Sequence, residues 1–287
     1  MDEIKSNLPH DQSSEGTCCC SPAASQPNGD PWGRGFQNAP QSITACHWFD
    51  GSVLSMSREI PRVKTKLNFG DALGSWKVRW GIGRNTYRIP PGLYAVGSPT
   101  PQSPVLVTAN YKMSFDKLRS QLAGDNAWIL ALDTKGINVW CAAGKGTFGT
   151  EEIVRRVEQE RLAEVVAHRQ LILPQLGATG VSAHEVQARS GWRIKYGPIR
   201  CEDLKAYFDS AMKANSQMRR IAFPLISRIK LIPVELVMSA RYLLIALVSF
   251  AALSGLNSQG YSFERFQSVG LKSVLLLLMA YLVGAAA

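Results

Sequence analysis

Two long apolar runs near the C-terminus constrain the fold more than any other feature of this sequence. Residues 234–256 and 269–287 are each long enough to cross the hydrocarbon core of a bilayer as a helix. They predict a membrane region over residues 234–287 with two spans. The basic, amphipathic residues 214–233 that precede it predict a segment lying at the membrane surface.

Basic residues beside the first run predict the orientation of the membrane region. Arg219, Arg220, Arg228 and Lys230 precede the first span, and such clusters stay on the cytosolic side. The net charge of +10 could also indicate nucleic acid, but this clustering favours anionic lipid and argues against a nucleic-acid partner. Residues 1–6 do not begin a secretory signal. We therefore expect a protein of the cytoplasmic membrane whose preceding domain faces the cytosol.

Strand and helix patterns alternate between residues 103 and 213. The apolar, β-branched stretches predict strands at 105–108, 127–132, 171–174 and 192–196, and the amphipathic stretches predict helices at 115–122, 151–168, 183–189 and 202–212. Such alternation is typical of a mostly parallel sheet with helices on both faces. The sequence therefore predicts an α/β domain over residues 64–213 with its core at 103–213.

The N-terminal part has a different composition. Residues 1–63 are rich in Ser, Pro, Gly, Gln and Asn without a sustained period, which predicts a disordered extension. Apolar and basic residues then alternate over residues 76–80, a turn follows, and residues 86–89 fit a returning strand. We therefore expect a hairpin over residues 76–89 at the start of the α/β domain.

Three consecutive cysteines, Cys18, Cys19 and Cys20, lie within that extension. Clustered thiols bind soft metals, so they could capture a mercuric ion. An accidental run in a disordered tail is the other interpretation. The six cysteines of the chain contain no Cys-x-x-Cys spacing, which gives no support for an iron–sulfur cluster or a structural zinc site.

A single cysteine, Cys141, lies between a predicted strand and a predicted helix. Its neighbours are small: Ala142, Ala143, Gly144 and Gly146. Ligands of α/β proteins bind at such strand-to-helix crossings, and small residues let a large flat ligand approach the backbone.

Three other interpretations of this motif remain open. Lys145 and the glycines around it could form a phosphate-binding loop, although Val139 and Gly146 break the Walker A pattern. Cys141 could be a nucleophile activated by His168 or His184. It could also be a buried structural cysteine, the usual role of a lone thiol at a strand end.

The segment 138–145, Asn-Val-Trp-Cys-Ala-Ala-Gly-Lys, resembles the cap motif of the mercury-methylation corrinoid proteins. These are membrane-anchored relatives of the corrinoid iron–sulfur protein of the acetyl-CoA pathway, and the resemblance runs from about Gly70 to the C-terminus. It implies a Rossmann-like, corrinoid-binding α/β domain followed by transmembrane helices.

The resemblance also implies a cofactor and the residues that hold it. Cys141 would be the lower axial ligand of cobalt in cobalamin or a related corrinoid, bound base-off. A thiolate donates electron density to the metal, and no histidine here follows the Asp-x-His-x-x-Gly pattern. The implied cofactor contacts are Asn138, Val139, Trp140, Cys141, Ala142, Ala143, Gly144, Lys145 and Gly146, together with Thr108, Gln175, Gly177, Ala178 and Gly180.

The implied activity is that of a methyltransferase working under anaerobic conditions. The resemblance implies corrinoid-dependent methyl transfer to inorganic Hg(II), giving methylmercury. A methyltetrahydrofolate or a methyl-donor enzyme would supply the methyl group, and a ferredoxin-like iron–sulfur protein would supply electrons. Two alternatives stay open: a methyl-carrying corrinoid protein of a carbonyl/acetyl-CoA pathway, and a non-catalytic, soft-metal-binding membrane protein.

Overall fold

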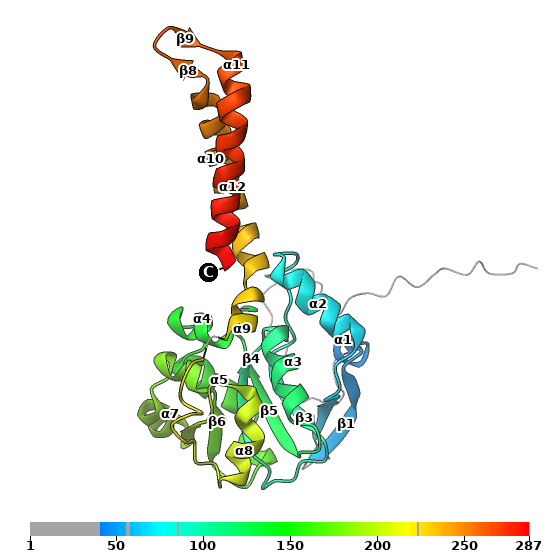
Figure 1. Ribbon diagram of the computed structural model, residues 1–287. Helices are drawn as coiled ribbons and strands as arrows, with labels where there is room; N and C mark the ends of the chain where they lie inside the picture. The colour runs from blue at the N-terminus through cyan, green and yellow to red at the C-terminus, as the bar shows by residue number, and fades with distance from the viewer. Residues whose placement is uncertain (1–40, 56–57, 85, 223, 287) are drawn as a thin grey trace, which may run out of the picture.

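The computed structural model describes residues 41–286 except 56–57, 85 and 223. An α/β domain forms one end of the molecule, and a helical hairpin stands away from it (Figure 1). The elements of the domain are α1 (Gln41–Thr44), β1 (Phe49–Ser55), β2 (Arg58–Val63), α2 (Phe69–Arg79), β3 (Gly92–Val96), β4 (Val105–Ala109), α3 (Lys112–Gln121), β5 (Ala127–Leu132), α4 (Val139–Gly144), α5 (Thr150–Gln159), α6 (Leu162–Val165), β6 (Gln170–Leu173), the 3-10 helix η1 (Gln175–Gly180), α7 (Ala183–Ser190), β7 (Arg193–Tyr196), η2 (Cys201–Asp203) and α8 (Leu204–Asp209).

Seven strands form the sheet in the order β1-β2-β3-β5-β4-β6-β7. Strand β4 pairs in parallel with both β5 and β6, and β6 pairs in parallel with β7. Strand β3 runs antiparallel to β5 but parallel to β2, and β1 is antiparallel to β2. The sheet is therefore mostly parallel, which confirms that part of the prediction.

Helices cover both faces of this sheet. Along β5 the side chains alternate: Trp128, Leu130 and Leu132 pack in the core beneath α4 to α7, whereas Ile129 packs in the core beneath α3 and α8. Every residue of β3, β4 and β5 is buried. The continuous apolar runs in the sequence reflect this burial on both faces.

The prediction of a disordered segment up to residue 63 is wrong for its last part. Residues 41–63 form α1, β1 and β2, and their side chains Ile43, Trp48 and Ile60 are buried. Their Ser-rich composition hid two strands that pair with each other as neighbours in the sequence, and β2 then joins the sheet beside β3. Residues 1–40, including Cys18, Cys19 and Cys20, lie outside the described part of the chain.

The predicted hairpin at 76–89 is also wrong, because its first half is helical. Asn68 accepts a hydrogen bond from the Asp71 N–H, and the Asp71 side chain accepts one from the Asn68 N–H, which is a capping box that starts α2. Residues 76–80 do alternate in polarity, but at helical spacing only Val78 among them faces the core. Trp76 and Trp80 lie together on the outer side.

Two long helices form the hairpin that follows the α/β domain. After α9 (Leu225–Ile229), α10 (Ile232–Ser254) leads outward, and α12 (Leu271–Ala286) returns beside it (Figure 1). The turn contains β8 (Leu256–Asn257), β9 (Gly260–Tyr261), α11 (Phe263–Arg265) and the π-helical segment η3 (Phe266–Gly270).

By length and composition, Ile232–Ser254 and Phe263–Gly284 could each cross a membrane. Hardly any of their residues are buried within the protein. These helices closely match the predicted apolar runs, although the second begins earlier than residue 269.

Candidate functional site

A single amide side chain holds the loop that leads into the Cys141 motif. Asn110, directly after β4, accepts hydrogen bonds at Oδ1 from the N–H groups of Thr134 and Gly136, at 3.1 and 3.0 Å. The Thr134 hydroxyl, 3.0 Å from the same oxygen, also lies 2.7 Å from the Ile137 carbonyl. The loop between β5 and α4 is thereby fixed to the end of the neighbouring strand.

Cys141 sits in the first turn of the short helix α4. The Asn138 side chain caps this helix by accepting the Cys141 N–H at 2.9 Å, in the capping role expected of an Asn at that position. Ala142 and Ala143 are buried against the domain, whereas Cys141 and Trp140 are exposed. The helix therefore presents its thiol at the surface while its alanines fix it to the core.

The backbone of the 3-10 helix η1 packs very closely against α4 and the residues that follow it. A Cβ on Gly180 would lie 2.3 Å from the Phe148 carbonyl oxygen and 2.9 Å from the Ala143 Cα. A Cβ on Gly177 would lie 2.5 Å from the Phe148 ring. These two glycines, expected at the sequence level to contact a cofactor, thus have a role in positioning the helix that carries Cys141.

A cleft of about 550 Å³ opens beside Cys141. It lies over the carboxyl ends of β4 and β6, the edge at which parallel α/β sheets bind ligands. Its walls are mostly apolar, and its lining includes Leu106, Val107, Thr108, Asn138, Val139, Trp140, Cys141, Ile172, Leu173, Pro174, Leu176, Pro198, Ile199, Cys201 and Leu204.

The cleft brings together only some of the predicted site residues. Thr108, Asn138, Val139, Trp140 and Cys141 line it. The remaining predicted contacts do not, and these are Ala142, Ala143, Gly144, Lys145, Gly146, Gln175, Gly177, Ala178 and Gly180.

Some of the predicted contacts outside the cleft are exposed, and one has a buried polar atom. Gly144, Lys145 and Gly146 are exposed where α4 ends, with open space around the two glycines. The Gln175 Oε1 is a buried oxygen without a hydrogen-bond partner in the described part of the chain, so a ligand donor could satisfy it.

Sequence reasoning missed several residues of the site. Asn110 is one, because the four hydrogen bonds of its side chain go to residues 23 to 26 positions away. Leu176, Leu204 and Cys201 are others, since only the fold brings them to the cleft. Their positions could have identified them. Asn110 and Leu176 follow predicted strands, and Cys201 and Leu204 lie at the start of a predicted helix.

Two thiols line the cleft, and their surroundings differ. Burial, helped by the charge of Glu202, raises the pKa of the Cys201 thiol to about 11, so it stays protonated near neutral pH. Cys141 is exposed at the cleft wall. Of the described histidines, His47 contacts Asp71 and His168 contacts the Ser103 carbonyl, both away from the cleft. Cys141 is therefore the accessible soft donor here.

The described residues hold no group of three or more His, Cys, Asp or Glu side chains suited to a metal ion. A metal at this site would therefore have to arrive with most of its ligands already supplied. A corrinoid would do so, because its ring supplies most of the ligands of its cobalt. An exposed thiol beside an apolar cleft fits that requirement.

Comparisons with known proteins point to one group. Residues 83–208 match the family described as CO dehydrogenase/acetyl-CoA synthase delta subunit. The gamma subunit of the acetyl-CoA decarbonylase/synthase complex of Archaeoglobus fulgidus is 29% identical over 128 residues, and that of Methanocaldococcus jannaschii is 31% identical over 116 residues. The gamma subunit of Methanopyrus kandleri is 29% identical over 128 residues.

These matches cover only part of each protein. The Archaeoglobus match spans 44% of this chain and 27% of that subunit, and the Methanocaldococcus match spans 40% and 23%. The chain thus spans about a quarter of the length of the curated relatives it matches. The segment matching the family contains the cleft-forming strands and α4, whereas α2 and the helical hairpin lie outside it.

Proposed function

We propose that this chain is a membrane-anchored corrinoid protein that carries a methyl group, akin to the methyl-carrying part of the acetyl-CoA pathway. The similarity of residues 83–208 to subunits of the acetyl-CoA decarbonylase/synthase complex supports this proposal. The observation that carries it is the exposed thiol of Cys141 at the wall of an apolar cleft, on the ligand-binding edge of the sheet.

The residues of the cleft have distinct roles in this proposal. A corrinoid, when bound, supplies a cobalt that can hold and release a methyl group. Cys141 would hold the cobalt through its thiolate, with the corrinoid bound base-off. Trp140 and Leu176 line the cleft and would shield a bound ring from water, and the Asn138 cap with the buried alanines holds the thiol in position. Gln175 lies outside the cleft lining, next to the lining residues Pro174 and Leu176, and its unpartnered oxygen could accept a hydrogen bond from an amide side arm.

The methyl acceptor is the finer part of the proposal, and there are two candidates. Similarity to gamma subunits of the acetyl-CoA decarbonylase/synthase complex favours an acceptor in an acetyl-CoA-forming reaction. The motif 138–145 and the thiolate ligand favour Hg(II), because a donating thiolate promotes release of the methyl group to a soft electrophile. In either case a methyltetrahydrofolate or a methyl-donor enzyme loads the methyl group, and a ferredoxin-like protein supplies electrons.

Membrane anchoring is also part of the proposal. The helices Ile232–Ser254 and Phe263–Gly284 support a two-span anchor. Basic residues before the first span, Arg219, Arg220, Arg228 and Lys230, support a cytosolic orientation of the α/β domain in the cytoplasmic membrane.

A comparison of Cys141→Ala with Cys201→Ala tests the proposal. The detergent-solubilised full chain is loaded anaerobically with a corrinoid, and its absorption spectrum and methyl transfer to Hg(II) and to an acetyl-CoA synthase are recorded. Cys141→Ala should change the spectrum and lower transfer by about 100-fold or more, since even outer-shell changes at metal sites cost up to that factor. Cys201→Ala should preserve the spectrum. A native spectrum and native transfer in Cys141→Ala would refute the thiolate role.

The two acceptors are separated in the same assay. Transfer to Hg(II) without transfer to the synthase supports mercury methylation, and the reverse supports the carbonyl-pathway role. A purified chain that binds no corrinoid would contradict both.

A further inference from the structure

Helix α2 carries an apolar stripe on the side that faces away from the domain. Phe69, Leu73, Trp76 and Trp80 follow helical spacing, so they share one side of α2, and Ile82 continues the apolar surface beyond its end. Phe69 is 81% exposed and Trp76 is 55% exposed. An exposed stripe that contains two tryptophans is unusual on the surface of a water-soluble domain.

The opposite side of α2 is fixed to the domain. Asp71 and Val78 are buried there, and Gly74 lies so close to Tyr87 that a Cβ would come within 2.5 Å of the Tyr87 hydroxyl. The outward position of the stripe is therefore built into the fold. Lys77 and Arg79 lie on its two flanks at helical spacing.

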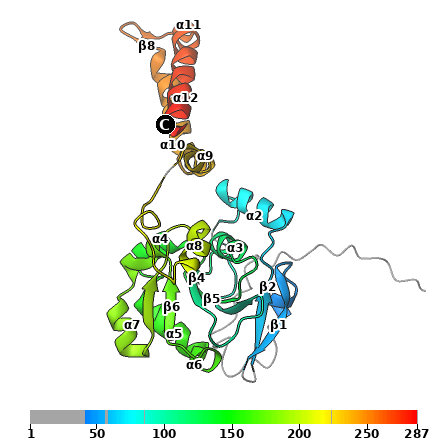
Figure 2. The ribbon, with the colours of Figure 1, turned by 60° about the horizontal axis from the view of Figure 1, so that its bottom comes forward.

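The position of α2 relative to the hairpin suggests what covers the stripe. Figures 1 and 2 both place α2 at the end of the domain nearest to the hairpin. A Cβ on Gly81 would lie 3.0 Å from a methyl carbon of Val237, so the end of α2 contacts α10. Val237 is in the second turn of α10, roughly 8 Å along the helix at its rise per residue.

In a membrane-spanning α10, the position of Val237 corresponds to the boundary between lipid headgroups and acyl chains. The 23 residues of α10 extend about 35 Å, slightly more than the hydrocarbon core of about 30 Å. If α10 spans the bilayer, its first turns, and with them the end of α2, lie in the interfacial region. Tryptophan is enriched at this depth because its ring is apolar while its N–H can hydrogen-bond.

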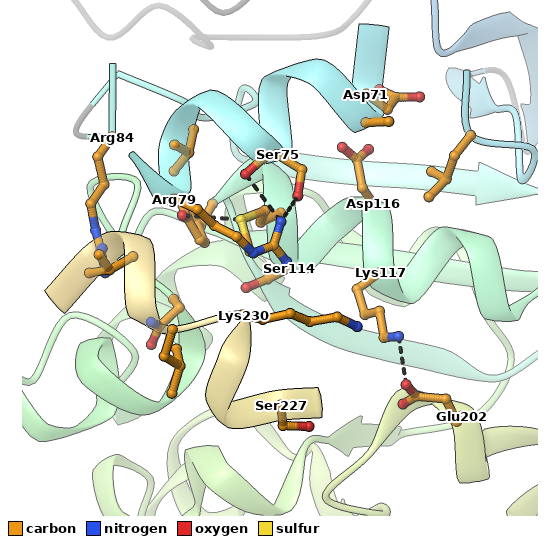
Figure 3. A pocket seen from close by; sticks show the side chains of 18 residues that line it. Asp71, Ser75, Arg79, Arg84, Ser114, Asp116, Lys117, Glu202, Ser227 and Lys230 are labelled. Atoms are coloured by element: carbon orange, nitrogen blue, oxygen red, sulfur yellow. Dashed lines mark hydrogen bonds and ion pairs between the residues drawn. The ribbon is translucent and has the colours of Figure 1, made fainter. Parts of the chain in front are cut away.

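A basic pocket of about 570 Å³ lies between α2, α3 and the start of α10. Arg79, Arg84 and Lys230 line it, and none of them forms an ion pair with a carboxylate in the described part of the chain. Figure 3 shows Lys230 extending across the pocket toward Lys117, which itself pairs with Glu202 at 2.6 Å.

The other acidic residues of the pocket wall are already neutralised. Asp71 accepts hydrogen bonds from Lys112 and Arg119 at 2.6 and 2.8 Å, and Asp116 does so at the same two distances. The pocket therefore keeps the positive charge of its three unpaired cations. Such a pocket suits a phosphate group, and at this depth in a membrane the phosphates are those of lipid headgroups.

We infer that α2 lies in the interface of an anionic bilayer, with its apolar stripe among the acyl chains and Arg79, Arg84 and Lys230 on lipid phosphates. This inference rests on the proposed membrane anchoring, because it requires α10 to cross the bilayer. It adds a second attachment: the α/β domain is held by its own surface as well as by the spans.

Tryptophan fluorescence tests the inference, because the chain has seven tryptophans and none lies in the spans. The full chain is reconstituted in nanodiscs of phosphatidylcholine and phosphatidylglycerol whose acyl chains are brominated near the headgroup. Bromine quenches only tryptophans within the bilayer, and Trp48, Trp128 and Trp192 are buried in the protein.

We expect strong quenching of the native chain and loss of most of it in the double variant Trp76→Phe/Trp80→Phe. Phenylalanine keeps the stripe apolar, so the variant stays docked while the reporters disappear. Equal quenching in the two proteins would overturn the inference. Native tryptophans unquenched by lipid would overturn it too, and would indicate that another protein covers the stripe.

The basic pocket is tested by the triple variant Arg79→Gln/Arg84→Gln/Lys230→Gln. It should reduce quenching in discs with phosphatidylglycerol, whereas the control Arg193→Gln/Lys195→Gln, at exposed positions of β7, should not. Quenching unchanged by the triple variant, or independent of anionic lipid, would overturn the phosphate part of the inference.

Alkaline extraction of vesicles carrying the same chain separates this result from membrane anchoring. A chain that remains in extracted vesicles but shows no lipid quenching refutes only the role of α2. A chain that leaves the vesicles refutes the anchoring itself, and with it the premise of the inference.

Discussion

Two regions at the same end of the sheet are held together by opposite means. The loop and helix around Cys141 depend on neutral groups: the Asn110 and Asn138 side chains and close backbone packing at Gly180. The contact between α2 and α3 depends on buried charges, with Asp71 and Lys112 almost fully inaccessible to solvent.

The difference follows from what each region presents at the surface. Buried ion pairs need desolvated, tightly fixed partners on every side, which a site open to a large ligand cannot provide. Amide caps and close glycine packing instead fix the buried side of a helix and leave its exposed side accessible to a ligand. The ionic cluster instead fixes a helix whose outer side is apolar, so that side can face lipid without disturbing the attachment.

Removing a charge from the ionic cluster should have the largest effect on stability. Asp71→Ala leaves Lys112 and Arg119 buried with one carboxylate fewer, and we expect it to cost about 3–5 kcal/mol of unfolding free energy. Glu164→Ala, which breaks the exposed pair with Arg161, should cost less than about 1 kcal/mol. Denaturant titration measures the unfolding free energy of both variants. Similar losses would mean that the buried cluster stabilises the fold no more than an exposed ion pair does.

The same cluster predicts a response to acid. Burial opposes ionisation of Asp71, but hydrogen bonds from Lys112, the Asn68 N–H and His47 outweigh it and hold the pKa of this carboxyl well below its ordinary value. Because the unfolded value is about 3.9, this stabilisation is complete above roughly pH 4 and declines as the pH falls toward the folded pKa. Unfolding free energy measured across this range should fall less steeply in Asp71→Asn.

The amide that holds the Cys141 loop should matter less for stability. Asn110→Ala leaves the N–H groups of Thr134 and Gly136 without their acceptor, at a cost of about 1–3 kcal/mol. Hydrogen exchange should accelerate at those two amides and remain slow in β1 and β2. Acceleration spread evenly over the sheet would show that Asn110 has no local role.

Two glycines near α4 offer a matched pair of substitutions. Gly180→Ala places a Cβ against the Phe148 carbonyl oxygen, so it should cost about 1–3 kcal/mol and shift the helix that carries Cys141. Gly144→Ala meets open space in a helical position and should stabilise by up to about 1 kcal/mol. Melting temperature separates them, and equal melting temperatures would contradict the packing role of Gly180.

The smallest expected effect is a difference in the rate of alkylation between the two thiols of the cleft. At about pH 8 iodoacetamide should modify exposed Cys141 well before Cys201, whose raised pKa of about 11 keeps it a thiol. Raising the pH toward that value should accelerate modification of Cys201. Peptide mass spectrometry follows each site, and early labelling of Cys201 at the lower pH would contradict the burial of its thiol.

The sequence predicted the parallel core well because its signals are local. The apolar run at 127–132 forms β5 where it was expected. Cys141 does follow that strand, but it lies within a short helix, α4, that the sequence did not predict. Predictions failed where distant contacts decide the structure. Strands β1 and β2 pair with each other, but only the contact of β2 with the distant strand β3 adds them to the sheet, and the period of α2 was misread because most of its large apolar side chains face outward.

For the candidate site, the sequence shows the motif but not the surface around it. Cys141 and Asn138 could be read from a motif, but the cleft itself is assembled from β4, β6 and α8, which are far apart in the sequence. The cluster of Asp71, Lys112, Asp116 and Arg119 was not foreseen, because its members look like ordinary surface charges until α2 covers them.

The short connection between domain and hairpin has a consequence for encounters with other molecules. The domain ends where the Ile199 N–H donates to the Met218 carbonyl at 2.9 Å, and residues 219–231 lead from there to α10. Even fully extended, such a segment reaches only roughly 45 Å. If the hairpin spans a membrane as proposed, this tether would confine the cleft to a thin layer, in which partners anchored in the same bilayer search in two dimensions at an effective concentration set by its length.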